Sequence, residues 1–257
     1  MAAPPRFLLL VTGASVPEVV TRFGGFPALF QDHLTRGFDP DASPSIDAFD
    51  LTAWGGAQRN VDVRRYDGVV VTGSPARIGD MLPWMRYGVD LLAECVGEGV
   101  PLLAVCFGHQ MLGVAMGADV GPNPPGYTVG TVKVRLEAPE GDELLSPLPP
   151  QLLANVSHLD AIRDPGPRLD VVGSCAHDRC HIVKAGPLAW GVQLHPEFDG
   201  EIVRAYIRAR AALVEERHGP GSAAALLAEA TDAPEAASLI ERFAHLAAGR
   251  RDGGGEG

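Results

Sequence analysis

The sequence has few cysteines, no long apolar run and no excess of positive charge. Its 257 residues include four cysteines, which is too few for a disulfide framework, so we expect free thiols in a reducing compartment. No stretch approaches the ~20 consecutive apolar residues of a membrane-spanning helix. Residues 1–6 lack the basic and apolar regions of a signal peptide. These absences predict a cytoplasmic protein that does not contact a membrane.

The balance of charge excludes a class of partner. The chain has 21 Lys and Arg against 32 Asp and Glu, a net charge of −11. Proteins that bind the nucleic-acid backbone gain affinity by neutralising phosphates with basic side chains, and here those side chains are few and scattered. We therefore expect no nucleic-acid partner. Hydrophobic residues make up 46% of the chain, enough to bury the core of one large α/β domain.

Short apolar segments alternate with helical ones along the first half of the chain. Residues 69–72 are β-branched at every position, and residues 102–105 are continuously apolar, as strands covered on both faces are. Pro83 begins a helical segment that ends near Val96. This order predicts an α/β fold with a mostly parallel central sheet and helices on both faces. Further strands are expected at 131–136, 171–173, 181–183 and 190–194.

The last 60 residues have a helical composition. Residues 199–217 form an amphipathic pattern, Gly219 to Gly221 interrupt it, and residues 223–246 are rich in Ala and Leu. We divide the chain into a domain at 1–218, a C-terminal helical extension at 219–248 and a disordered tail at 249–257. The extension can be a packed appendage, a dimer contact or a docking element.

Cys106 directly follows the apolar strand at 102–105 and precedes a Gly-containing turn and a helix. A nucleophile at such a turn is held out of the sheet on a tight backbone. The adjacent helix N-terminus favours a thiolate through its free N–H groups and its dipole. The alternative is a buried core thiol, since free cysteine is among the most buried residue types.

A second strand, at 190–194, ends in His195, Pro196 and Glu197. Residues two apart on an extended chain point to the same side, and Pro196 favours an extended His195. A carboxylate beside an imidazole selects its tautomer, and an imidazole beside a thiol favours a thiolate–imidazolium pair. The alternative for His195 and Glu197 alone is a solvated ion pair at a strand end.

A third strand, at 69–72, ends in Gly73 and Ser74. Acyl transfer needs two N–H donors directed at the developing oxyanion. We expect them at Gly73, which has no side chain in the way, and at Phe107, directly after the nucleophile. The alternative for Gly73 is an ordinary turn.

These three segments resemble the class I glutamine amidotransferases, whose Cys-His-Glu domains release ammonia from glutamine. The family's Gly-x-Cys-x-Gly-x-Gln pattern is matched at Cys106, Gly108 and Gln110, with Ala104 in place of the first glycine. Its His-Pro-Glu motif is matched at residues 195–197. The resemblance covers residues 6 to 212, is strongest to the stand-alone, GMP-synthetase-like branch, and implies the flavodoxin-like glutaminase fold with a small antiparallel sheet.

The resemblance also implies site residues and a reaction. Gln110 and Ser74 are expected to hold the substrate, and Ser157 and His158 resemble the family's Ser-His-x-Asp segment. Cys106 is expected to form a γ-glutamyl thioester, with His195 as acid and base and Glu197 as its orienting carboxylate. No cofactor is implied. The expected partners are glutamine or another γ-glutamyl compound, a separate synthase that receives ammonia, and a second copy of the chain.

Two further alternatives remain from the sequence. The chain can instead be a free-standing γ-glutamyl hydrolase, or a regulatory protein that retains the fold without catalysis. Cys175, Cys180 and His181 have zinc-like separations, but no second ligand pair of a familiar structural site accompanies them. We therefore predict no metal site.

Overall fold

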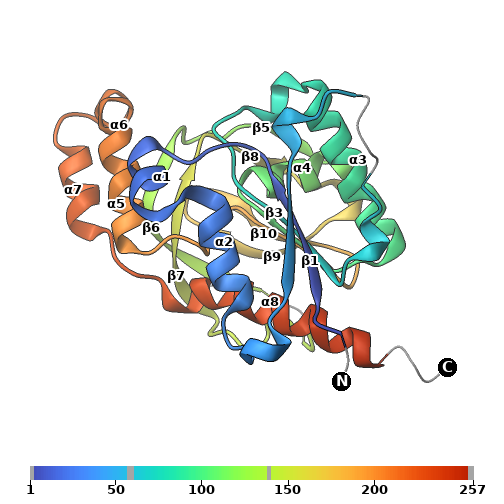
Figure 1. Cartoon of the computed structure of the whole chain (residues 1–257). Helices are drawn as coiled ribbons and strands as arrows, with labels where there is room; N and C mark the ends of the chain where they lie inside the picture. The colour runs from blue at the N-terminus through green and yellow to red at the C-terminus, as the bar shows by residue number, and fades with distance from the viewer. Residues whose placement is uncertain (1–2, 57–60, 138–139, 254–257) are drawn as a thin grey trace.

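A mixed β-sheet crosses the computed structural model, which describes residues 3–56, 61–137 and 140–253 (Figure 1). Within these residues nine strands form one sheet, in the order β2-β1-β3-β4-β11-β10-β9-β6-β7. Their bounds are β1 (Arg6–Val11), β2 (Ser45–Asp50), β3 (Gly68–Val71), β4 (Leu102–Val105), β6 (Thr128–Leu136), β7 (Gln151–His158), β9 (Asp170–Cys175), β10 (Asp178–Ala185) and β11 (Ala189–Val192).

The sheet has a parallel half and an antiparallel half. Strands β2, β1, β3, β4 and β11 pair in parallel, and the pairings from β11 through β10, β9 and β6 to β7 are antiparallel. The α/β fold is thereby confirmed. The antiparallel strands continue the main sheet, and a separate two-stranded sheet consists of β5 (Asp119–Pro122) and β8 (Asp160–Asp164).

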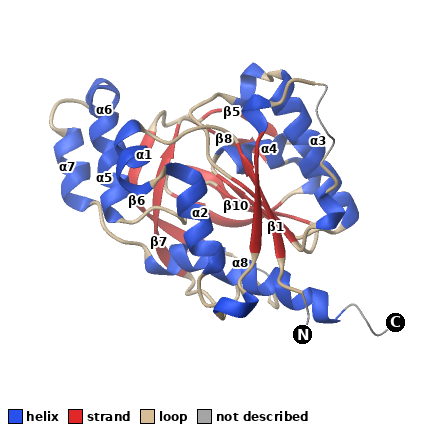
Figure 2. Cartoon of the chain, in the orientation of Figure 1, coloured by secondary structure: helices blue, strands red, loops and turns tan. Residues whose placement is uncertain are grey.

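Helices cover both faces of the parallel half (Figures 1 and 2). In β1, Phe7 and Leu9 pack in one apolar cluster, and Leu8 and Leu10 pack in another. This division follows from the alternation of side chains along a strand, and it explains why the strand is apolar throughout. The first cluster includes residues of α1 (Pro17–Phe23), α2 (Gly25–Thr35), α5 (Gly200–Ala209) and α8 (Pro234–Gly253), and the second includes residues of α3 (Pro83–Glu98) and α4 (Phe107–Ala115).

The C-terminal helices α6 (Ala211–His218), α7 (Ser222–Glu229) and α8 pack on the domain. Leu239, Ile240 and Phe243 of α8 are fully buried in the first apolar cluster. Helix α8 continues to Gly253, and Arg250 near its end forms an ion pair of 2.7 Å with Glu143; the disordered tail expected at 249–257 stays a prediction. Residues 254–257 lie outside the described part of the chain.

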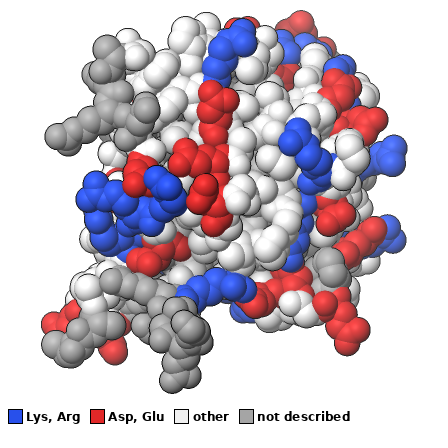
Figure 3. All heavy atoms as spheres, turned by 90° about the vertical axis from the view of Figure 1, so that its right-hand side faces the viewer, with Lys and Arg blue, Asp and Glu red and all other residues white. Residues whose placement is uncertain are grey.

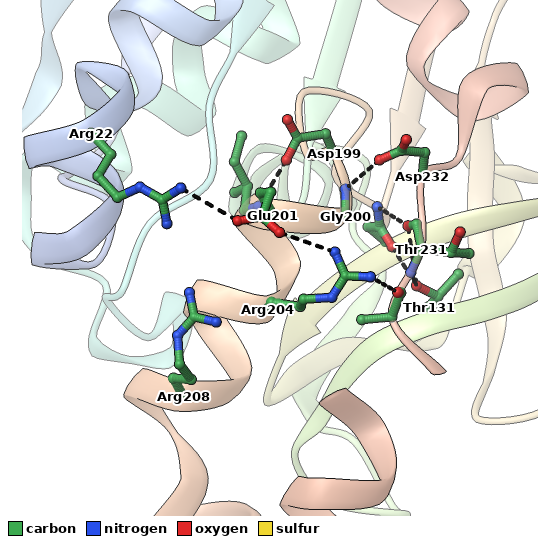
Figure 4. A network of polar contacts seen from close by, with 12 residues as sticks. Arg22, Thr131, Asp199, Gly200, Glu201, Arg204, Arg208, Thr231 and Asp232 are labelled. Carbon is green, nitrogen blue, oxygen red and sulfur yellow. Dashed lines mark hydrogen bonds and ion pairs between the residues drawn. The ribbon is translucent and has the colours of Figure 1, made fainter. Parts of the chain in front are cut away.

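The segment between α7 and α8 is bonded to the start of α5 and to β6 (Figure 4). Asp232 Oδ1 accepts the Gly200 N–H at 2.8 Å, and the Thr231 N–H donates to Thr131 Oγ1 at 3.1 Å. Asn155 of β7 donates from Nδ2 to the Thr231 carbonyl at 3.2 Å. These bonds join the C-terminal extension to α5 and to the antiparallel half of the sheet.

The surface is of mixed charge. Figure 3 shows Lys and Arg side by side with Asp and Glu on the face that lies on the right of Figure 1. Such mixing offers no broad positive surface to a phosphate backbone there. None of the helices in the described ranges combines the length and apolarity that a membrane crossing requires.

Candidate active site

Three neighbouring parallel strands bring the predicted motifs to one edge of the sheet. Strand β4 pairs with β3 on one side and β11 on the other, with Ala104 opposite Val71 and Val105 opposite Val192. Because all three strands run in the same direction, their carboxyl ends meet at the same edge. Cys106 therefore stands between the segment after β3, which begins with Thr72 and Gly73, and the segment after β11, which contains His195.

Cys106 has an unusual backbone conformation. Its φ is +51° and its ψ is −99°, and it is the residue that caps the N-terminus of α4. A positive φ costs a non-glycine residue roughly 1–2 kcal/mol, so the surrounding bonds must hold it there. One of them is the Cys106 N–H donating to the Val192 carbonyl at 2.8 Å. A Cβ on Gly108 would lie 2.8 Å from Val71 Cβ, so this turn needs glycine to lie against β3.

His195 and Glu197 form a buried pair directly after β11. His195 Nδ1 lies 2.7 Å from Glu197 Oε1, with both side chains at most 3% exposed. The backbone N–H of His195 donates to the backbone carbonyl of Asn155 at 2.8 Å. The imidazole ring stacks on the Phe198 ring, with centroids 4.0 Å apart and planes 4° from parallel. The imidazole is therefore fixed by its backbone, by its neighbour ring and by the carboxylate.

The environment of His195 favours its protonated form. Burial is the largest single influence on the His195 pKa and lowers it. The charges of Glu197 and Cys106, with the hydrogen bonds that both make to the ring, outweigh burial and raise the pKa of His195 to about 10. An imidazolium beside Cys106 is the charge partner that a thiolate requires.

Gly73 and Phe107 flank the cysteine. A Cβ on Gly73 would lie 2.8 Å from His195 Cε1 and 3.6 Å from Cys106 Cβ, so no larger residue fits between β3 and the ring without a shift. The Gly73 carbonyl is held by Thr12 Oγ1 at 2.8 Å. Phe107 is the first residue of α4, and its N–H has no acceptor within that helix. The two groups named as oxyanion donors thus lie beside the thiol.

A cavity of about 610 Å³ opens above these residues. Seven of the nine predicted site residues line it: Ser74, Cys106, Phe107, Gln110, Ser157, His158 and His195. The other two, Gly73 and Glu197, lie against the His195 ring. The structure therefore brings all the predicted site residues to one place, although they come from four separate parts of the sequence.

The predicted substrate-contacting side chains Ser74, Gln110 and Ser157 each form a hydrogen bond to a distant segment of the chain. Ser74 Oγ donates to the Thr12 carbonyl at 2.6 Å, and Gln110 Nε2 donates to the Asp160 carbonyl at 2.8 Å. Ser157 Oγ lies 2.9 Å from the Tyr127 hydroxyl. These bonds fix the wall of the cavity and leave Ser74 and Gln110 with part of their hydrogen-bonding capacity for a ligand.

Several lining residues were not predicted as site residues. Arg77 forms a two-point ion pair with Asp160, at 2.7 and 3.3 Å, and Tyr127, Tyr206 and Arg210 line the same cavity. The sequence could have indicated that Tyr206 and Arg210 lie together, because residues four apart on a helix share one face. It could not have indicated the Arg77–Asp160 pair, since that pair joins segments 83 residues apart.

The comparison with protein families agrees with this geometry. Residues 51–210 match the glutamine amidotransferase class-I family. This stretch is more than half of the chain and includes the strand ends at Gly73, Cys106 and His195. The chain belongs to the class I glutamine amidotransferase family. Helices α6, α7 and α8 of this amidotransferase lie beyond the matched residues.

Curated relatives of this amidotransferase include GMP synthase proteins. It is 29% identical over 138 residues to one of the subunits of the glutamine-hydrolyzing GMP synthase of Sulfolobus acidocaldarius, covering 53% of this chain and 70% of that relative. It is 30% identical over 134 residues to the glutamine-hydrolyzing GMP synthase of Aeropyrum pernix, covering 52% of this chain and 24% of that protein. The chain thus matches about a quarter of the longer synthase.

A solved glutamine amidotransferase of Thermotoga maritima has the same fold. The two structures superpose with a TM-score of 0.65 at 18% sequence identity, and the superposition covers 97% of this chain and 98% of that chain. The superposition therefore extends beyond the family match and includes the C-terminal helices of the present amidotransferase.

Proposed function

We propose that this amidotransferase cleaves the γ-glutamyl amide of glutamine through a covalent thioester on Cys106 and delivers the ammonia to a separate synthase. One observation carries the proposal: a cysteine held at positive φ at a helix N-terminus, beside an imidazole that a buried carboxylate holds at 2.7 Å. This is the arrangement of an activated nucleophile, its base and an orienting group.

The first half of the reaction forms the thioester. The Cys106 thiolate attacks the side-chain carbonyl carbon, and the carbonyl electron pair moves to oxygen, where the N–H groups of Gly73 and Phe107 stabilise it. Collapse of the tetrahedral intermediate breaks the C–N bond. The departing nitrogen takes its proton from the His195 imidazolium and leaves as ammonia.

The second half hydrolyses the thioester. His195, now neutral, accepts a proton from water as the oxygen attacks the same carbonyl carbon. The second tetrahedral intermediate expels the Cys106 thiolate, so glutamate leaves and the thiolate–imidazolium pair is restored. Glu197 keeps the ring in one tautomer and orientation throughout.

The proposal is tested by trapping the intermediate. Purified protein is incubated with glutamine, quenched in acid and digested, and the Cys106 peptide is expected to carry a glutamyl adduct by mass spectrometry while ammonia is released. Cys106→Ser should abolish both signals. Cys95→Ser is the matched control, because Cys95 is a buried thiol of α3 whose pKa burial raises to about 12. Ammonia release that survives Cys106→Ser would contradict the assignment.

The size of the cavity favours a second candidate, a free-standing γ-glutamyl hydrolase. At about 610 Å³ the cavity lies within the ~300–1,000 Å³ typical of drug-sized ligands, more than glutamine fills. Tyr127, Arg210 and Leu213 offer apolar and cationic contacts for a group beyond the scissile bond. High turnover of γ-glutamyl peptides by the chain alone would favour the hydrolase. Glutamine turnover that rises sharply with a co-purified synthase would favour the ammonia-delivering amidotransferase.

A non-catalytic regulatory protein is the third candidate. It predicts that Cys106→Ser leaves the cellular phenotype unchanged. The strained conformation of Cys106 weighs against it, because a residue without a chemical role gains nothing from a positive φ.

A further inference from the structure

The cavity is lined by two groups of residues from different parts of the fold. The first includes Gln110 and Asp160, which are joined by the 2.8 Å bond from Gln110 Nε2 to the Asp160 carbonyl, and it contains side chains expected to hold the γ-glutamyl part of the substrate. The second comes from the segment before α1 and from α5 and α6; helices α1 and α5 lie side by side (Figure 1). We call this second group the α5 wall, and its members are Ser15, Tyr206, Arg210 and Leu213.

The α5 wall lies beside the imidazole of His195. The Tyr206 ring centroid is 6.3 Å from that of His195 and 4.6 Å from that of Phe198, the ring that stacks on His195. The Tyr206 hydroxyl lies 2.7 Å from Ser15 Oγ, which fixes the wall to the segment before α1. In the proposed reaction the departing nitrogen takes its proton from His195. A group attached to that nitrogen therefore lies toward the α5 wall.

Arg210 gives this wall a positive charge without a carboxylate partner. It is the residue at which α5 ends and α6 begins, and its backbone N–H donates to the Tyr206 and Ile207 carbonyls at 3.0 and 3.2 Å. Two arginines line the cavity. Arg77 is paired with Asp160 at 2.7 Å, whereas Arg210 forms no ion pair within the described ranges. The planar fork of a guanidinium matches a carboxylate in two-point pairing.

Tyr127 links the α5 wall to the nucleophile. Its hydroxyl lies 2.9 Å from Ser157 Oγ, and the Ser157 carbonyl lies 3.8 Å from Cys106 Sγ. Burial raises the pKa of Tyr127, and the nearby charge of Arg210 partly opposes that effect. The space beside His195 thus has an aromatic side chain near the sulfur and a guanidinium near that aromatic side chain. This arrangement suits a small organic amine with an anionic end.

We propose that the α5 wall binds the leaving group of γ-glutamyl conjugates whose amine carries a carboxylate, as in γ-glutamyl amino acids and peptides, and that Arg210 pairs with that carboxylate. The inference rests on the thioester mechanism proposed above and adds a substrate class to it. The C–N bond breaks, the nitrogen takes the proton of His195, and the amino acid or peptide leaves while the γ-glutamyl group stays on Cys106. Glutamine releases only ammonia, which is too small to contact Arg210 at the same time.

The test compares substrates that differ by one charge. γ-Glutamyl-alanine and γ-glutamyl-alanylglycine are each paired with their C-terminal amides, which have the same size and no carboxylate. We expect wild-type kcat/KM to be ~10-fold higher for the acid than for the amide in at least one pair, the lower end of the range for a charge-assisted hydrogen bond, because Arg210 is exposed. This preference should shrink as the salt concentration rises, since salt screens exposed charges. The salt dependence is measured on the wild type and does not depend on whether a variant folds.

Substitutions of Arg210 assign the preference to its charge. Arg210→Met should abolish the preference for the acid and leave kcat/KM for glutamine unchanged. Arg210→Lys keeps the charge and should retain part of the preference. Arg217→Met is the matched control, because Arg217 is an exposed arginine of α6 that does not line the cavity; it should keep the full preference.

The outcomes separate this inference from the proposed function. A wild type without preference for either acid, a preference that persists in Arg210→Met, or one that disappears equally in Arg217→Met would overturn the inference. If the Cys106 adduct still forms with glutamine in those cases, the thioester mechanism stands. If no adduct forms with glutamine or with any of the four conjugates, the proposed function fails and this inference fails with it.

Discussion

The substitution Glu197→Gln isolates the electrostatic part of the proposed triad. It removes one charge and keeps the size of the side chain and a hydrogen-bonding oxygen beside His195. Burial lowers the pKa of His195, and Glu197 supplies the largest of the effects that raise it to about 10. Two unit charges whose centres are about 4 Å apart interact by roughly 4 kcal/mol at an effective dielectric constant of 20, which corresponds to a factor of ~10³ in an equilibrium or a rate.

Glutamine hydrolysis and cysteine alkylation each measure the effect of removing the interaction between Glu197 and His195. We expect kcat/KM for glutamine to fall ~100-fold at pH 9 and only about twofold at pH 7, because the loss of about 4 kcal/mol brings the pKa of His195 from about 10 down towards neutrality and the imidazolium that protonates the departing amine is depleted mainly at alkaline pH. Iodoacetamide should label Cys106 more slowly at pH 7, since the thiolate loses its charge partner. A raised pKa means that His195 keeps its proton until the pH approaches 10. Activity should therefore decline on the alkaline side near pH 10 in the wild type and at lower pH in the variant.

The control is Glu216→Gln, an exposed carboxylate on α6. It makes the same chemical change far from the ring and should leave both rates unaltered. Activity of Glu197→Gln at pH 9 within about threefold of the wild type, or an alkaline limb that moves to higher pH, would refute the electrostatic reasoning, because about 4 kcal/mol of interaction cannot be removed without such a change.

Two further substitutions test the packing. Gly73→Ala places a Cβ 2.8 Å from His195 Cε1 and should lower kcat/KM by ~100-fold, as a displacement of ~1 Å does; Gly79→Ala, whose Cβ meets nothing within 4 Å, should have no effect. Phe243→Ala, in the fully buried part of α8, should lower the free energy of unfolding in urea by about 3–5 kcal/mol. Leu82→Ala, at a side chain 44% exposed, should change it by less than ~0.5 kcal/mol, and equal effects of the two would contradict the packing described.

Much of the site was predictable because its residues follow apolar strands. The runs at 69–72 and 102–105 are buried on both faces, which only a covered parallel sheet provides. Parallel strands end at one edge, so a cysteine, a glycine and a histidine that each follow such a strand meet there. The observed order β3-β4-β11 places Cys106 between Gly73 and His195, and local pattern alone does not specify that neighbour relation.

The antiparallel half was less predictable. In strand β7, Leu153 interrupts the alternation of apolar Leu152, Ala154 and Val156 with the polar residues of the other face, which weakens the pattern that marks a strand. Asn155 is nonetheless fully buried, because Thr131 and the Phe198 carbonyl satisfy its amide. The sequence shows the polarity of such a residue and not the distant partners that allow its burial. For the same reason the sequence did not reveal that the rings of His158 and His181 lie 6.2 Å apart.

The position of α8 decides between the roles that its composition left open. A helix that joins two copies of a chain, or receives a partner, through its apolar stripe must expose that stripe in the free protein. Leu239, Ile240 and Phe243 are instead 0% exposed, and the Phe243 ring lies 6.4 Å from Phe7 and 6.5 Å from Trp190 in the core strands β1 and β11. A contact through that stripe would require the helix to leave the core and expose those strands. The apolar stripe of helix α8 therefore belongs to the core and is not available to a second copy of the chain or to the proposed synthase.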